Sequence, residues 1–379
     1  MSLLTFDTAI GYRPTWVEIS EEAFIFNLLQ IKKYIGNSVQ LMAVLKADAY
    51  GHGANVLAPI AIENGVDIIG VSSLEEGIAL RSSGVKAPIL VLAGVFPLEN
   101  FSVAIEHGLT PTVASLEAAQ QLVVAAKSVQ QPILFHLKID TGMGRIGVSP
   151  QGAIPLLEWI RTQSAIQLAG VYTHFSSAGE DRDVSAGQLK KFNVIKIKVK
   201  ELFAHKVLFH SANSAALFSI PESLDDMVRP GIALFGESLI SLPKAIQLKP
   251  VLSWFSKIIY LKRIVKGTSI SYGQTWTAKK DSDIATIPVG YADGVSRKFS
   301  NRGFVLVQGV KCPIVGRVTM DHMMIDVTGV KTDIGDVVTL IGRQGDEVIS
   351  ASDCSSWAET ISYEIFCNIS KRVPRVLVS

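Results

Sequence analysis

The sequence predicts an α/β plus β fold, with an N-terminal (β/α)8 TIM-type barrel and a C-terminal, mostly β domain. Its 379 residues suggest two domains. From about residue 20 to 235, eight short apolar runs alternate with segments of helical periodicity, which fits a barrel. After Pro250, β-branched and aromatic runs are separated by Gly and Asp turns. We therefore expect a cofactor-binding barrel over residues 1–245 and a β-rich domain over 246–379.

The barrel strands are expected where apolar runs end in polar or reactive residues. They are Leu41–Leu45, Asp67–Val71, Ile89–Leu92, Leu109–Val113, Ile133–Ile139, Leu168–Thr173, Lys206–Phe209 and Met227–Arg229. Ser20 and Ser115 precede two of the helical segments, with acidic residues close behind, as N-cap residues do. A doubly wound open sheet is the competing arrangement for such an alternation.

The C-terminal strands are expected within Val251–Val265 and at Ile284–Tyr291, Phe304–Val307, Pro313–Val318, Met323–Val327 and Val337–Ile341. In this region we expect one helix, over Ser352–Thr360, because only that segment has helical periodicity. The first strand of the chain, Thr15–Ile19, suits either domain.

Composition excludes several classes of protein. With 48% hydrophobic and 18% charged residues and a net charge of +2, the chain has neither a disordered composition nor a nucleic-acid patch. The three cysteines, Cys312, Cys354 and Cys367, are too few and too far apart for a disulfide framework or a zinc site. The first residues lack a signal-peptide pattern, and no apolar run reaches the ~18 residues of a membrane span. We expect a cytoplasmic protein without a metal.

The most informative segment is AVLKADAYGHG, residues 43–53. It places Lys46 at the end of an apolar run, with Tyr50 and two glycines following. An amine at a strand end, beside an aromatic hydroxyl and a bendable backbone, suits covalent attachment of an aldehyde cofactor. A solvated lysine at a strand terminus is the competing interpretation.

Reactive residue types recur at the ends of the other strands, where barrel enzymes place their chemistry. They are Asp140 and Arg145 after the fifth strand, His174 after the sixth, HSANSAA (residues 210–216) after the seventh, and Arg229, Gly231 and Ile232 at the eighth. Ser211, Ser214 and Gly231 therefore lie in the last two loops, which commonly bind phosphate. On the fifth strand, His136, Lys138 and Asp140 share one face, so Lys138 is either paired with an acid or modified.

These motifs resemble those of the alanine racemase family. The resemblance extends from Pro14 to Arg375 through AVLKADAYGHG, HLKIDTGMGRIG, THFSSA, HSANSAA, MVRPGIALFG, ISYG, GYADG, GRVTMD and SYEIFCNISKRVPR. It implies a (β/α)8 barrel joined to a β domain, a head-to-tail homodimer with shared active sites, and pyridoxal 5'-phosphate as cofactor. The implied reaction interconverts L-alanine and D-alanine, which supplies D-alanine for peptidoglycan in the cell wall.

The resemblance also implies residue roles. Lys46 matches the lysine that forms the Schiff base and acts as one base, and Tyr272 matches the second base, acting on the partner's cofactor. Arg229 matches the donor to the pyridine nitrogen, supported by His174, and Arg145 lies near the phenolic oxygen. The phosphate contacts match Tyr50, Ser214, Gly231, Ile232 and Tyr363. The substrate pocket and its entrance match Tyr291, Met320, Arg317 and Asp321, and Lys138 matches a lysine that is carbamylated and pairs with Arg145.

Racemisation itself requires two bases, because a proton leaves one face of the substrate carbon and another arrives on the opposite face. A free tyrosine has a pKa of ~10 and a free lysine ~10.4, so both must be lowered for work near neutral pH. Two departures from the family pattern, Thr319 for a common cysteine and His322 for a common glutamine, lie near the entrance and bear on substrate preference. The alternatives are a racemase for serine or a bulkier amino acid, a decarboxylase of similar architecture, and a non-catalytic pyridoxal-phosphate carrier.

Overall fold

The computed structural model describes residues 12–127 and 129–379, which form two compact units. The barrel unit contains residues 23–49 and 53–249. The β unit contains residues 12–22, 50–52 and 250–379. Among the described residues, no helix is both long enough and apolar enough to cross a membrane.

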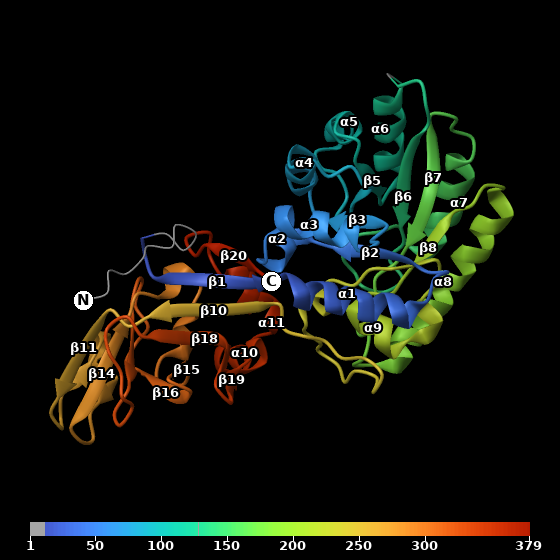
Figure 1. Cartoon of the computed structure of the whole chain (residues 1–379). Coiled ribbons are helices and arrows are strands. Elements are labelled where there is room, and N and C mark those ends of the chain that lie inside the picture. Colours follow the sequence, from blue (N-terminus) through green and yellow to red (C-terminus); the bar gives the residue numbers. More distant parts are fainter. Residues whose placement is uncertain (1–11, 128) are drawn as a thin grey trace. The chain divides into compact units, whose positions relative to one another are not determined.

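Eight parallel strands form the barrel, in the spatial order β8-β7-β6-β5-β4-β3-β2-β9 (Figure 1). They are β2 (Gln40–Val44), β3 (Ile68–Val71), β4 (Ile89–Val91), β5 (Thr110–Val113), β6 (Ile133–Lys138), β7 (Ile166–Tyr172), β8 (Leu208–His210) and β9 (Met227–Val228). The backbone N–H of Arg229 donates to the carbonyl of Ala212 at 3.0 Å, and this bond helps to join the first and last strands of that order. The predicted barrel is confirmed, with every expected strand in place.

The barrel helices bury their apolar faces against these strands. The helices are α1 (Glu21–Ile35), α3 (Ala54–Glu63), α4 (Leu74–Ser82), α5 (Phe101–Glu106), α6 (Leu116–Ala126), α7 (Pro150–Ile160), α8 (Arg182–Leu202) and α9 (Ser214–Ser219). In α6, Ala118, Leu122 and Ala126 recur at helical spacing and are buried. The hydroxyl of Ser115 accepts from the N–H of Ala118, so this predicted N-cap is confirmed.

The β unit contains a long sheet in the order β11-β14-β17-β16-β15-β18-β10-β1-β20, with β19 paired to β18. Its strands are β1 (Thr15–Ser20), β10 (Leu252–Lys257), β11 (Tyr260–Ile264), β14 (Ser282–Ile287), β15 (Phe304–Val307), β16 (Val310–Val315), β17 (Met323–Asp326), β18 (Val337–Gln344), β19 (Glu347–Ile349) and β20 (Arg375–Val378). The first strand, β1, runs antiparallel to β10 and parallel to β20, so it belongs to this unit. A short second sheet pairs β12 (Ser269–Ile270) with β13 (Trp276–Thr277).

The helices of the β unit differ from expectation. The predicted helix over Ser352–Thr360 corresponds to α10 (Ala351–Ala358), but a second helix, α11 (Ser362–Asn368), follows it. The prediction of a single helix was therefore wrong. Helix α11 has seven residues and buries Ser362, Ile365 and Phe366. A segment of this length is too short for its periodicity to distinguish a helix from a loop.

One buried amide joins three segments of the barrel unit and provides a test of the fold. Asn27 is 0% exposed. Its side-chain N–H groups donate to the carbonyls of Leu234, at 3.1 Å, and Lys249, at 2.7 Å, while its oxygen accepts from the N–H of Lys249 at 2.7 Å.

We expect Asn27→Ala to lower the free energy of unfolding by about 2 kcal/mol, because it removes hydrogen-bond partners from buried backbone groups. Urea unfolding measures the change. The matched control is Asn193→Ala on the exposed face of α8, expected within about 0.5 kcal/mol of the parent. Equal unfolding midpoints for the two variants would contradict this role of Asn27.

Candidate active site

Lys46 follows β2 directly and opens an unusual backbone turn. Ala47, Asp48, Ala49 and Tyr50 all have left-handed φ values, between 52° and 54°. For residues with a side chain this conformation costs roughly 1–2 kcal/mol each, and such strain collects at functional sites. The segment labelled α2 (Lys46–Tyr50) is therefore a left-handed turn. It determines the direction in which the chain leaves Lys46.

Two carboxylates hold this turn. Asp48 accepts from the N–H of Ala54 at 2.7 Å. Glu76 accepts from the N–H of Ala47 with one oxygen and from that of Ser72 with the other, both at 2.7 Å. Because Ser72 follows β3, Glu76 ties the loop that contains Lys46 to the next loop of the barrel. Sequence reasoning missed Glu76, since nothing near it in sequence indicates this contact.

Arg229, at the end of β9, is buried with 4% exposure. Its Nη2 donates to the carbonyls of Thr173, at 2.7 Å, and Ser211, at 3.1 Å, and its Nη1 lies 3.0 Å from Nδ1 of His210. The guanidinium also lies 5.3 Å from the ring centroid of Tyr172. Burial lowers the pKa of Arg229 to about 10, so the group stays charged at neutral pH.

The contact with His210 starts a directed chain of hydrogen bonds. Because arginine only donates, Nδ1 of His210 accepts, and its Nε2 carries the proton. That Nε2 lies 2.8 Å from Nδ1 of His136, which accepts in turn. Burial, reinforced by the charge of Arg229, lowers the pKa of His136 to about 3 and that of His210 well below its usual range. Both imidazoles are therefore neutral, and they orient the guanidinium without competing for its charge.

Gly170, on β7, leaves the space that this pair of histidines needs. A Cβ atom at this position would lie 2.5 Å from Nδ1 of His136. Sequence reasoning placed His136 on the barrel face but did not connect it to Arg229.

The Arg229 guanidinium donates its described hydrogen bonds to His210, Thr173 and Ser211, and none of them goes to the imidazole of His174. Burial, then the charges of Arg229 and Arg145, lowers the pKa of His174 to about 3. His174 is thus a neutral group near these cations, and its support of Arg229 stays a prediction.

Lys138 ends β6 and is buried. Its Nζ donates to the carbonyl of Leu92 at 3.2 Å and lies 5.3 Å from the ring centroid of Tyr172. Burial lowers the pKa of Lys138 to about 8, and the charges of Arg145, Arg229 and Lys46 act in the same direction. Asp140 opposes that shift, but its carboxylate accepts from the N–H groups of Gly142, Gly144 and Arg145.

The donors expected to contact phosphate come together at the end of β8. The hydroxyl of Ser214 accepts from the N–H of Gly231 at 2.9 Å and from that of Ala233 at 3.4 Å. Backbone N–H groups that converge on one oxygen form the kind of concavity that binds anions. Ile232 lies between these two donors in sequence and is buried.

The barrel unit therefore has a strongly positive mouth. The charges of Lys46, Arg145 and Arg229 lower the pKa of Lys138, and those of Lys138 and the same three cations lower that of His174, while Asp140 raises that of Lys138. This donor set fits an anionic cofactor that carries both a phosphate and an aldehyde, because it combines positive charge with a strand-end amine.

The remaining predicted residues lie in the β unit. The rings of Tyr50 and Tyr363 meet edge-to-face, with centroids 5.7 Å apart. Burial raises the pKa of Tyr363 to about 12, so its hydroxyl stays protonated and able to donate. Tyr272 lies at the start of η4 (Tyr272–Gln274) and is 71% exposed. The adjacent Gly273 packs so closely against Arg317 that a Cβ there would lie 3.1 Å from the guanidinium carbon.

Tyr291 and Met320 lie on neighbouring backbone segments. The N–H of Tyr291 donates to the carbonyl of Thr319, and that of Ala292 to the carbonyl of Met320, both at 3.0 Å. Thr319, one of the two departures from the family pattern, closes the turn that contains Met320 and Asp321. Its hydroxyl donates to the carbonyl of His322 at 2.7 Å and accepts from the N–H of the same residue at 3.1 Å.

Comparison with known proteins decides the family. The model of the alanine racemase N-terminal domain matches residues 19–239, and that of the C-terminal domain matches residues 251–377. The alanine racemase of Halothermothrix orenii is 45% identical over 366 residues, which cover 96% of each chain. The chain belongs to the alanine racemase family. Alanine racemases depend on pyridoxal phosphate, and this member is an isomerase of that kind.

Solved structures of alanine racemases agree with this assignment. The enzyme of Clostridium difficile 630 superposes with a TM-score of 0.91 at 36% identity, over 97% of this chain and 96% of the other. The Bacillus anthracis alanine racemase with bound L-Ala-P has a TM-score of 0.90 at 38% identity, with the same coverage. A histidine racemase from Leuconostoc mesenteroides subsp. sake has a TM-score of 0.88 at 28% identity, over 97% of this chain and 99% of the other. Architecture alone therefore does not define the amino acid.

The neutral histidines predict how stability depends on pH. The folded-state pKa of His136, about 3, lies below the ordinary value of 6.5, so between these values the unfolded chain binds the additional proton. The free energy of unfolding therefore falls as pH falls through this window, by about 1.4 kcal/mol per pH unit for one histidine. We expect His136→Phe to reduce that slope by this amount, as measured by urea unfolding from pH 6.5 to 4.

A matched control separates titration from packing. Thr141→Val removes the buried 2.7 Å hydrogen bond to Thr173 but no titrating group, so it should lower stability without changing the slope. If His136→Phe and the parent have the same slope, His136 is not the buried neutral group described here.

Proposed function

We propose that the barrel holds pyridoxal phosphate through Lys46 and interconverts L-alanine and D-alanine with Tyr272 of a partner subunit as the second base. The observation that supports this most is the placement of two cations just beyond the ends of adjacent barrel strands: Lys46 follows β2, and the buried, charged Arg229 follows β9. When bound, the cofactor withdraws electrons from the substrate carbon and so acidifies its proton.

Lys46 has two tasks in this proposal. Its amine would bind the aldehyde carbon of the cofactor covalently, with water as the leaving group, and once released it would exchange a proton with one face of the substrate carbon. The left-handed turn over residues 47–50, held by Asp48 and Glu76, fixes the origin of that side chain. A second base must act on the opposite face, because a single base would return the same enantiomer.

Arg229 would face the ring nitrogen of the cofactor. Because it only donates, it would leave the ring nitrogen of the cofactor unprotonated, so that the ring would withdraw less charge from the substrate carbon. Such a partner limits stray protonation outside the substrate carbon and favours racemisation over transamination. His210 and, through it, His136 keep the guanidinium in this orientation. His174 and Arg145 complete the cofactor side, with Arg145 near the phenolic oxygen and the substrate.

The phosphate would lie at the opposite end of the cofactor. We assign it to the hydroxyl of Ser214, the backbone at Gly231 and Ile232, and the hydroxyls of Tyr50 and Tyr363. The support is the convergence of backbone donors on Ser214 and the protonated state of Tyr363.

We infer a head-to-tail homodimer from the family to which the chain belongs, and exposed side chains of the β unit support it. Tyr272, Met320 and Tyr291 are 71%, 53% and 44% exposed, although all are large. Tyr291 and Met320 lie on hydrogen-bonded neighbouring segments, and exposed apolar groups that lie close together are typical of a protein interface. In the dimer, residues 246–379 of one subunit contribute this surface to the partner's barrel, with Arg317 and Asp321 at the entrance. We place the enzyme in the cytoplasm, where it supplies D-alanine for peptidoglycan.

Complementation of two inactive variants tests the shared site. We expect Lys46→Ala and Tyr272→Phe each to abolish alanine racemisation. Mixed chains should recover about a quarter of the parent activity, because half of the dimers are mixed and one of their two sites has both residues. Circular dichroism of L-alanine solutions measures turnover, and native mass spectrometry measures exchange. The control Tyr260→Phe alters another exposed tyrosine of the β unit and should stay active. Exchange without recovered activity would place Tyr272 outside the partner's site.

We also propose that Lys138 is carbamylated. Its amine nitrogen bonds to the carbon of carbon dioxide and releases one proton to solvent, which leaves a carbamate anion beside Arg145. Only a neutral amine reacts, and the lowered pKa of Lys138, about 8, provides one near neutral pH. The anion would relieve the burial of a fourth cation in the barrel mouth.

The carbamate predicts a distinct signal in solution. After equilibration with 13C-bicarbonate at pH 8, the enzyme should give a carbamate resonance in 13C NMR spectra. The resonance should be absent from Lys138→Gln and present in the control Lys206→Gln, which alters an exposed lysine of the same unit. Identical spectra for the parent and Lys138→Gln would leave Lys138 as an unmodified amine.

A further inference from the structure

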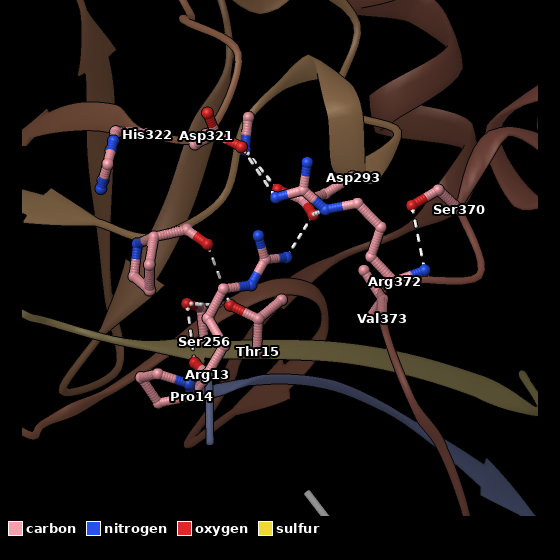
Figure 2. A network of polar contacts seen from close by, with 12 residues as sticks. Arg13, Pro14, Thr15, Ser256, Asp293, Asp321, His322, Ser370, Arg372 and Val373 are labelled. Atoms are coloured by element: carbon pink, nitrogen blue, oxygen red, sulfur yellow. Dashed lines mark hydrogen bonds and ion pairs between the residues drawn. The ribbon is translucent and has the colours of Figure 1, made fainter. Parts of the chain in front are cut away.

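A second buried ionic centre lies in the β unit, at Asp293. This residue ends the 3-10 turn η5 (Tyr291–Asp293) and its side chain is 0% exposed. One carboxylate oxygen contacts the guanidinium groups of both Arg13 and Arg372, the latter at 3.2 Å (Figure 2). The other oxygen accepts from the N–H of Gly290 at 2.9 Å. The backbone carbonyl of Asp293 accepts from the N–H of Ser370 at 2.9 Å.

Arg372 extends this centre towards the surface. Its Nη2 donates to a carboxylate oxygen of Asp321 at 2.7 Å, so one guanidinium bridges the two acids. The side chains of Arg372 and Asp321 are 42% and 46% exposed, whereas that of Asp293 is fully buried. Asp293 is therefore the fixed end of the bridge and Asp321 its outer end.

The backbone provides a second link between Asp293 and the same region. The turn that Asp293 closes donates from Tyr291 and Ala292 to the carbonyls of Thr319 and Met320. The two segments lie in direct contact, since a Cβ at Gly290 would lie 2.3 Å from either of these carbonyl oxygens. A shift of the Asp293 turn therefore moves the segment from Thr319 to Asp321 as well.

The chemistry of this centre requires a carboxylate. Two guanidinium groups and one N–H all donate, so every partner of the side chain needs an acceptor. An asparagine has the same shape, but it offers one acceptor oxygen and directs an NH2 group at another donor. It also leaves two guanidinium groups near a neutral partner, which is costly for groups that are partly buried.

We propose that Asp293 is a positioning residue for the substrate entrance. Through Arg372 it fixes Asp321, and through its own turn it fixes Tyr291 and Met320. This inference rests on the proposed function, in which these three residues border the substrate pocket. Asp293 itself touches neither substrate nor cofactor, and acts only through the residues that it holds.

The experiment compares Asp293→Asn, Arg372→Ala and Arg372→Lys in the holoenzyme. The matched control is Glu359→Gln, since Glu359 also contacts two cations, Lys298 at 2.8 Å and Arg302 at 2.7 Å, but is exposed. For Asp293→Asn we expect faster hydrogen exchange at the amides of residues 290–292 and 319–322 than in the control. We also expect KM for alanine to rise about tenfold with kcat within about twofold of the parent, as happens when binding contacts common to the ground state and the transition state are lost. Arg372→Ala should also speed hydrogen exchange and raise KM. Arg372→Lys should have smaller effects on both, because lysine keeps the positive charge.

The outcomes distinguish this inference from the proposed function. The positioning role would be overturned if neither Asp293→Asn nor Arg372→Ala showed faster hydrogen exchange at the two segments than Glu359→Gln. Faster exchange with an unchanged KM would overturn the link to the entrance. A parent holoenzyme that fails to racemise alanine would overturn the proposed function. Faster hydrogen exchange in Asp293→Asn would still show that the Asp293 carboxylate stabilises its own turn. If Asp293→Asn does not fold, the two Arg372 variants decide the question, because that side chain lies at the surface.

Discussion

One buried positive charge determines the chemistry of the barrel unit. Arg229 is 4% exposed, and none of the described ion pairs includes it. Its hydrogen bonds go to two carbonyls and one neutral imidazole, so the charge is solvated but not neutralised. The same charge helps to keep His136, His210 and His174 unprotonated and lowers the pKa of Lys138. Burial, reinforced by the charge of Arg229, therefore keeps these three histidines neutral.

The barrel topology explains how such a site arises from residues far apart in sequence. Parallel strands bring their carboxyl ends to one edge, so Lys46 and Arg229, which follow the adjacent strands β2 and β9, lie at the same mouth. Topology alone does not fix the direction of a side chain, however. The left-handed turn after Lys46 and the carboxylate of Glu76 add that precision, at a cost in backbone strain.

Sequence reasoning identified what short-range patterns encode. All eight barrel strands were predictable because apolar runs of strand length recur between helical segments, and the motifs then indicated the family. The helix α11 and the strand β20 were not predictable, since each is short and depends on packing against the rest of its unit. The contact of Asp293 with Arg13 joins residues 280 positions apart, and that of Glu76 with Ala47 joins different loops. No local pattern contains such pairings, because a carboxylate on an exposed turn and one in a buried centre look alike in sequence.

The two units use buried charge in opposite ways. In the barrel, the described hydrogen bonds of the Arg229 guanidinium go to no carboxylate, although the charge of Asp225 acts on it, and positive charge is available to an anionic ligand. In the β unit, the carboxylate of Asp293 receives two guanidinium groups, and one of these is shared with a second acid. The first arrangement is costly until a ligand binds, whereas the second is complete within the protein and stabilises a fixed geometry. A racemase needs both properties. It must bind an anionic cofactor and control the charge of the cofactor ring. Because a small substrate such as alanine provides few contacts of its own, the residues that border its pocket must also keep a fixed position.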